Sequence, residues 1–143
     1  MFIPELIANM RELDRAELRA TSRNPFHEQL STSLRWSISP GAAFSPKGEL
    51  LCLFGAAPAQ IMGDTAVPWL IGTNALGRYA RALKEGAAGY LGAIQQQYPR
   101  LWNYVDARNL PSIRWLKRMG FVIEAPEAFG HESLPFHPFH KGF

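Results

Sequence analysis

Residues 1–36 carry apolar side chains at helical spacing. Two short helices are predicted, over residues 5–10 and over residues 11–19, the second with Leu and Ala side chains near one face. Asn24 and Pro25 are typical of the N-cap and the first position of a helix. They predict a third helix that runs to about residue 36, so we expect this part of the chain to be helical.

The apolar pattern changes in the next part of the chain. Residues 49–57 and 67–72 are short, nearly continuous apolar runs that end at Gly or Pro, which is typical of strands covered on both faces. The turn-rich stretch from residue 37 to residue 48 predicts a hairpin or a loop. A sheet is therefore expected to begin here.

The longest amphipathic segment covers residues 74–98. Its apolar side chains fall within a single helical stripe, so the segment predicts a helix that lies on the sheet. Gly86, Gly89 and Gly92 lie inside it, and each costs about 1 kcal/mol relative to alanine in a helix interior. We therefore expect the helix to break near Gly86.

A strand, a helix and a second strand follow. Residues 101–107 predict the first strand, and Asn109 is placed to cap a helix that ends at Met119. Gly120 then supplies the left-handed residue that ends a helix. Residues 121–124 predict the second strand.

The C-terminal tail, residues 134–140, is predicted to be an edge strand, because Pro135 and Pro138 have no N–H for a central ladder. His137 and His140 have a spacing that metal ions tolerate. On a strand, however, they point to opposite faces, and no carboxylate cluster lies nearby in the sequence. We expect no metal site.

Composition defines the class of protein. The chain has 143 residues, of which 47% are hydrophobic and 19% are charged, the balance of one globular domain. We expect a single domain over residues 1–143, with a helical part at 1–36 and the sheet and its packing helices at 49–143. The lone Cys52 excludes an intrachain disulfide and a Cys-rich zinc cluster.

Charge and hydropathy exclude further classes. The net charge is +3 and the basic residues are scattered, so we expect no nucleic-acid binding. No apolar stretch reaches the roughly 18–20 residues of a membrane span. The N-terminus has no basic region ahead of a hydrophobic core, so no signal peptide is expected.

One motif carries information about the fold. Asn109, after a strand, opens a helix that ends in Gly120-Phe121, and Phe121 lies twelve residues after Asn109. This spacing resembles the C-terminal motif of the GNAT superfamily of N-acyltransferases. The resemblance implies an α/β domain with a mixed, mostly antiparallel twisted sheet and helices on both faces. It also implies that strands 67–72 and 101–107 splay apart.

A wider resemblance is to the phage family that includes the internal virion protein A of T7-like phages. It rests on Leu53-Phe54-Gly55, on residues 68–73 and 98–109, and on the helix from Asn109 to Phe121. It implies a virion assembly or internal virion protein that uses a degenerate GNAT fold to bind other phage proteins. The expected location is the virion or the cytoplasm of the bacterial host, with no cofactor and an unknown oligomeric state.

The alternative is an active GNAT enzyme that transfers an acyl group from acyl-CoA, such as acetyl-CoA, to an amine. GNAT enzymes hold the acyl-CoA pyrophosphate on an Arg/Gln-x-x-Gly-x-Gly/Ala loop, and residues 72–81 lack that spacing. The residues that would bind acyl-CoA here are Gly72, Thr73, Asn74, Gly77 and Asn109. A third possibility is a small-molecule or nucleotide binder without chemistry.

The catalytic residues stay open at this stage. Many GNAT enzymes have a Tyr four residues before the Gly of Gly-Phe, where this chain has Leu116. Leu cannot donate a proton, so Tyr104 would have to replace the general acid. The base for the amine is open among Glu49, Asp64 and Asp106.

The last predicted helix also suggests an interaction surface. Arg114, Lys117 and Arg118 lie beside Trp115, and basic side chains around one large aromatic are typical of an interface. We expect this surface to dock another phage protein. In the alternative, Trp115 packs under a loop and the three charges only keep the domain soluble.

Overall fold

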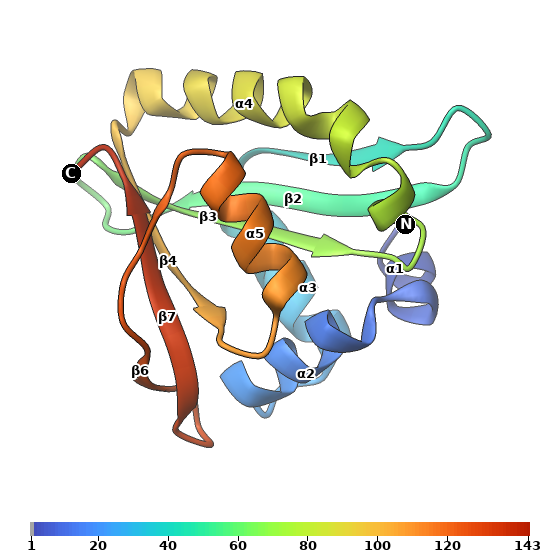
Figure 1. The fold of residues 1–143 in the computed structure, drawn as a ribbon, viewed down its shortest axis with the longest axis horizontal. Helices are drawn as coiled ribbons and strands as arrows, with labels where there is room; N and C mark the ends of the chain where they lie inside the picture. Colours follow the sequence, from blue (N-terminus) through green and yellow to red (C-terminus); the bar gives the residue numbers. More distant parts are fainter. Residues whose placement is uncertain (1) are drawn as a thin grey trace.

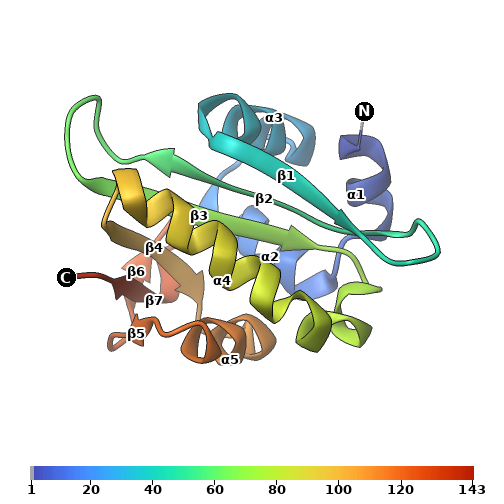
Figure 2. The ribbon, with the colours of Figure 1, turned by 90° about the horizontal axis from the view of Figure 1, so that it is seen from above.

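The computed structural model describes residues 2–143 and arranges them in three layers (Figure 1). One open sheet lies between α1, α2 and α3 on one face and α4 and α5 on the other (Figure 2). The helices are α1 (Ile3–Asn9), α2 (Glu12–Thr21), α3 (Phe26–Trp36), α4 (Ala80–Gln97) and α5 (Leu110–Arg118), with a 3-10 turn, η1 (Leu76–Arg78). The strands are β1 (Ile38–Phe44), β2 (Leu50–Pro58), β3 (Thr65–Gly72), β4 (Arg100–Asp106), β5 (Val122–Ile123), β6 (Glu127–Phe129) and β7 (Leu134–Lys141).

The sheet opens between β3 and β4. The strand order is β1-β2-β3-β4-β7-β5, with β6 also paired to β7. Within the described residues β3 and β4 form the only parallel pair, and they pair only at Thr65 with Arg100 and at Ala66 with Leu101. Beyond these residues the two strands diverge (Figure 1). The predicted fold class, with its mostly antiparallel sheet and its splay, is confirmed.

Apolar cores on both faces of the sheet hold the layers together, and a smaller cluster of Leu51, Cys52 and Leu76 lies near η1. On the α4–α5 face, Ile94 and Ile113 pack with Leu101 and Val105 of β4 and with Phe121. On the α1–α3 face, the core consists of Leu6, Met10, Leu30, Leu50, Leu53 and Ile71. Because both faces of the sheet are buried, β2 and β3 appear in the sequence as continuous apolar runs.

The predicted end of the last helix is confirmed. The Asn109 side chain accepts a hydrogen bond from the Ser112 N–H, which caps α5. Gly120 has a φ of 91°, the left-handed conformation that favours glycine. This turn brings Phe121, which is 6% exposed, back into the core.

The prediction of an edge strand at the C-terminus was wrong. β7 is a central strand, with β4 on one side and β5 and β6 on the other. Pro138 faces the gap between β5 and β6, where its carbonyl accepts from the Glu124 N–H, and Pro135 lies past the end of β4. Each missing N–H therefore falls where the neighbouring strand is interrupted or has ended.

Two predictions for the long helix, α4, were wrong. The helix starts later than predicted, and it does not break near Gly86. The segment 74–98 begins with η1, and α4 starts only at Ala80. It then runs without interruption through Gly86 to Gln97. Glycine lowers helix stability but removes no backbone hydrogen bond, so it does not by itself break a helix.

Two further local predictions were incomplete. The stretch 37–48 contains β1, which forms a hairpin with β2. Pro25, and not Asn24, occupies the N-cap position of α3, and no side chain caps this helix. Within residues 2–143, no helix is both long and apolar enough to cross a membrane.

Candidate functional site

The divergence of β3 and β4 opens a cleft of about 710 Å³. On one side it is lined by α4, α5 and the turn before α4, including Gly77, Leu83 and Trp115. On the other side it is lined by α2, α3 and β6, including Glu17 and Phe129. Since α4–α5 and α2–α3 cover opposite faces of the sheet (Figure 2), the cleft can be reached from both faces.

The hydrogen bonds of β3 show which of its peptide groups face the cleft. The Thr73 N–H donates to Leu51 O, and the Ala59 N–H donates to Thr65 O. These two bonds fix the phase of the antiparallel β2–β3 ladder, because bonded and non-bonded pairs alternate along it. The even-numbered residues of β3 therefore turn their N–H and C=O groups away from β2 and toward β4.

In the part of β3 that borders the cleft, the peptide group of Leu70 is the one without a hydrogen-bond partner within the described chain. Pro68 O accepts from Asn103 Nδ2 at 2.8 Å. The Gly72 N–H donates to Asp14 Oδ2 at 2.8 Å. The N–H and C=O of Leu70, which lines the cleft between them, have no partner among residues 2–143. They are therefore free to bond to solvent or to a bound molecule.

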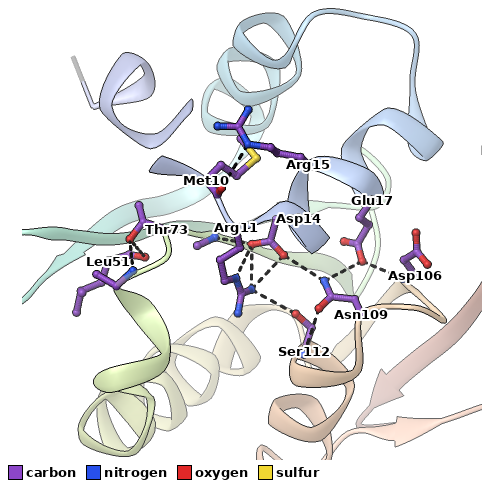
Figure 3. A network of polar contacts seen from close by, with 12 residues as sticks. Met10, Arg11, Asp14, Arg15, Glu17, Leu51, Thr73, Asp106, Asn109 and Ser112 are labelled. Atoms are coloured by element: carbon purple, nitrogen blue, oxygen red, sulfur yellow. Dashed lines mark hydrogen bonds and ion pairs between the residues drawn. The ribbon is translucent and has the colours of Figure 1, made fainter. Parts of the chain in front are cut away.

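Asp14 fills the end of the splay next to β3 (Figure 3). Its carboxylate accepts from Arg11 Nε at 3.0 Å, from the Gly72 N–H, and from Asn109 Nδ2 at 3.1 Å. Asp14 is 1% exposed, and Arg11 neutralises its charge with an ion pair of 2.9 Å. Asp14 is therefore a fully satisfied structural residue.

Glu17, one turn further along α2, lies at the end of β4 (Figure 3). Its Oε1 accepts from the Asp106 N–H at 2.9 Å and from Asn109 Nδ2 at 3.4 Å. Burial raises the pKa of Glu17 to about 7, although the hydrogen bond from Asp106 lowers it in part. Glu17 is the only carboxylate among the described residues that line the cleft. Near neutral pH it can therefore both accept and release a proton.

The residues predicted to bind acyl-CoA are only partly brought to the cleft. The N–H groups of Gly72, Thr73 and Asn74 already bond to Asp14, to Leu51 O and to Asn9 O. The Asn109 amide is used by α2 and by the cap of α5. Gly77 lines the cleft, and its N–H makes no hydrogen bond within the described chain.

None of the three predicted bases lines the cleft. Glu49 and Asp64 form ion pairs with Arg78 and Arg100 at the surface. Burial alone would raise the pKa of Asp106, but its hydrogen bonds with Arg108 outweigh burial and hold this pKa below the usual value. These environments favour Glu17 as the base.

Tyr104 and Leu116 do line the cleft. The Tyr104 hydroxyl donates to Glu127 Oε1 at 2.6 Å, and this hydrogen bond raises the pKa of Tyr104. Leu116 is half-buried against the α4–α5 core and has no proton to give. The hydroxyl proton of Tyr104 is therefore engaged with Glu127, and the role of Tyr104 as the acid stays a prediction.

The basic residues of α5 divide into two groups. Arg114 and Arg118 line the cleft, whereas Lys117 does not. Trp115 is half-buried, packs against the α4–α5 core and forms part of the cleft wall. Docking of another protein on this helix stays a prediction.

Sequence reasoning missed Asp14 and Glu17. They lie three residues apart on α2, on the face that also carries the buried Ala20. Two carboxylates on the buried face of an amphipathic helix are unusual, because a buried charge requires a partner. The presence of two carboxylates at these positions could be seen in the sequence, and it could have identified Asp14 and Glu17 as candidate site residues.

Comparisons with known proteins identify the fold. No protein-family model matches the chain, and no curated protein matches its sequence. It is similar to the structure of a GCN5-related N-acetyltransferase from Kribbella flavida, with a TM-score of 0.66 and 19% identity over 99% of this chain and 88% of that one. A ribosomal-protein-alanine N-acetyltransferase from Brucella melitensis has a TM-score of 0.64 and 15% identity over 85% and 81% of the two chains.

A third similar structure is the spermidine N-acetyltransferase from Vibrio cholerae, solved in complex with CoA and spermine. It has a TM-score of 0.59 and 17% identity over 82% of this chain and 75% of that one. At these identities the similarity shows the fold: the chain has the GNAT fold. The comparisons give no support to the resemblance to phage virion proteins.

Proposed function

We propose that this protein is an N-acyltransferase that moves an acyl group from acyl-CoA to an amine. One observation carries the proposal: the cleft in the splay passes between the two faces of the sheet and contains both a free peptide group, that of Leu70, and a titratable carboxylate, that of Glu17. Two substrates can therefore meet there from opposite faces. The similar structures named as N-acetyltransferases support the same class of reaction.

The α4–α5 side of the cleft fits acyl-CoA. Leu83 and Trp115 provide an apolar wall for an acyl-pantetheine arm. A Cβ added at Gly77 or Gly86 would meet no atom within 4 Å, so the helix surface there is open. Arg114 and Arg118 line this side and supply positive charge for phosphate groups.

The free N–H groups at the start of α4 add to this fit. The N–H groups of Gly77, Ala80, Arg81 and Ala82 have no acceptor within residues 2–143, whereas the Leu83 N–H already donates to Tyr79 O. The positive end of the helix dipole lies at the same place, and together they favour a phosphate. Of the residues predicted to bind acyl-CoA, Gly77 is therefore the one that we propose for the phosphate groups.

The α2–α3 side then receives the amine. Glu17 accepts a proton from the attacking nitrogen, while the Leu70 N–H donates to the thioester oxygen as it gains negative charge. The nitrogen forms the new C–N bond, the C–S bond breaks, and the sulfur leaves as a thiol with one proton. For a neutral amine, the proton lost by nitrogen balances the one gained by sulfur; an amine that arrives as an ammonium ion releases one further proton to solvent before it attacks.

The test combines binding with turnover. Acetyl-CoA is expected to raise the Tm of the protein, because a ligand at 100 times its Kd adds about 2.7 kcal/mol to the free energy of unfolding. With a panel of amines, free thiol is expected to appear together with acetylated product. If acetyl-CoA neither shifts the Tm nor releases thiol with any amine, the protein is not an acetyltransferase.

A further inference from the structure

The α2–α3 side of the cleft combines a large apolar surface with a few polar side chains. Its wall includes Leu18, Leu30, Trp69, Ile71, Tyr104 and Phe129. The rings of Tyr104 and Phe129 stack with centroids 3.9 Å apart and an angle of 24°. A wall of this kind binds an apolar or aromatic body, since it offers a flat surface and little polarity.

Most polar side chains in this wall are already satisfied within the protein. Gln29 donates to two backbone carbonyls, and the Trp69 indole N–H donates to Ser37 Oγ at 2.7 Å. The Thr21 hydroxyl donates to Glu17 O at 2.8 Å. Among the described residues of this wall, the second carboxylate oxygen of Glu17, the amide oxygen of Gln29 and the Ser33 hydroxyl make no hydrogen bond.

Charge on this side is equally limited. Glu17 is the one carboxylate in the described wall. The neighbouring helical surface carries the guanidinium groups of Arg15 and Arg19, both placed over the Phe26 ring. A further carboxylate, Glu127, lies outside this wall and already accepts from the Tyr104 hydroxyl. A second ammonium group on a substrate would therefore enter a largely apolar site with no carboxylate in its wall to pair with, which is costly.

We propose that the acceptor is an amine with a single positive charge on an apolar or aromatic body, and that polyamines are poor acceptors. This rests on the proposed function, because it names the amine that meets the acyl group in the same cleft. It also separates this protein from the similar spermidine acetyltransferase, whose structure contains spermine. The amine can come from a free small molecule or from the N-terminus of a peptide.

Turnover with matched acceptors tests the proposal. With acetyl-CoA as donor, kcat/KM is measured for phenethylamine, for a tetrapeptide amide with N-terminal Phe, and for spermidine. We expect at least one of the two aromatic monoamines to exceed spermidine by about tenfold or more, because an unpaired buried charge costs more than 1.4 kcal/mol. The better of the two identifies the source of the amine. Equal or better turnover of spermidine overturns the proposal.

A designed carboxylate provides a second, independent readout. Ser33→Glu places a carboxylate in the wall and is expected to lower the phenethylamine-to-spermidine ratio of kcat/KM by about tenfold. Thr32→Glu is the control, because Thr32 is exposed on the same helix and does not line the cleft. The Tm of both variants shows that they fold. An unchanged ratio in a folded Ser33→Glu variant contradicts the assignment of this wall to the acceptor.

Failure of the two proposals can be told apart. If acetyl-CoA shifts the Tm but no monoamine is acetylated, the acceptor assignment is wrong while the donor site stands. If acetyl-CoA has no effect, the acyltransferase proposal fails. Binding of phenethylamine and of spermidine to the protein alone, measured by calorimetry, then still tests the acceptor assignment, and tighter binding of spermidine overturns it.

Discussion

Asp14 and Glu17 show how two carboxylates on one helix acquire different properties. Asp14 is ion-paired with Arg11 and accepts two further hydrogen bonds, so its buried carboxylate has a full set of partners. Glu17 has no cationic partner in its hydrogen bonds, and burial raises its pKa to about 7. The first residue therefore holds the structure, and the second is available for proton transfer.

Glu17 makes stability depend on pH. The folded protein keeps the Glu17 proton up to about pH 7, whereas the unfolded chain loses it near the ordinary glutamate pKa of 4.5. Because the folded state binds more protons in this window, this group lowers stability as pH rises from about 4.5 to about 7. Glu17→Gln cannot ionise and is expected to remove this decline, a relative gain of about 1–3 kcal/mol at high pH.

Urea unfolding of both proteins at about pH 4.5, 6 and 8 measures this difference. Glu12→Gln is the matched control, since Glu12 is exposed on the same helix and paired only with Arg19. Parallel pH profiles for the Glu17→Gln variant and the unmodified protein would show that Glu17 titrates in its ordinary range.

Asp14 is expected to be essential for stability. Asp14→Ala leaves the Arg11 guanidinium and the Gly72 N–H without their partner in a buried site, and breaking such a pair costs about 3–5 kcal/mol. Glu12→Ala, at the exposed surface, is expected to change stability by less than about 0.5 kcal/mol. Chemical denaturation compares the two variants, and equal effects would mean that Asp14 contributes no more than a surface carboxylate.

At the scale of elements, the sequence predicted correctly those helices and strands that depend on neighbouring residues in the chain. The Asn109 cap and Gly120 predicted α5 correctly, and the apolar runs predicted β2 and β3. The position of β7 could not be predicted, because the two prolines are tolerated only through gaps in neighbouring strands. The site was equally non-local, since Glu17 meets Asp106 and Asn109 only after the chain has folded.

The glycines of α4 provide a test of helix stability. A Cβ added at Gly89 would meet no atom within 4 Å, so Gly89→Ala is expected to stabilise the protein by about 0.5–1 kcal/mol. Gly120→Ala is the matched contrast, because a φ of 91° strains any residue with a side chain, and a loss of about 1 kcal/mol is expected. Thermal unfolding reports both changes. A destabilising Gly89→Ala would argue against a regular helix at that position.

At the scale of the whole molecule, charge separates the two sides of the cleft. Arg114 and Arg118 line the α4–α5 side, whereas Glu17 belongs to the α2–α3 side. The double variant Arg114→Glu/Arg118→Glu is expected to weaken acetyl-CoA binding by about tenfold. Lys117→Glu, on the same helix but outside the cleft wall, is expected to have a much smaller effect. Calorimetry at low salt measures both, and equal effects would place the phosphates elsewhere.

The hydrogen bonds of Asp14 and Glu17 also link the exposure of one amide of β3 to the exposure of one amide of β4. The Gly72 and Asp106 N–H groups belong to strands that do not pair there, yet both are covered by the same helix. Any local unfolding that lifts α2 exposes both amides to solvent at once. The deuterium exchange rates of these two amides are therefore expected to match each other and to rise together in Asp14→Ala. The exchange rate of this pair of amides would then measure how often α2 separates from the ends of β3 and β4.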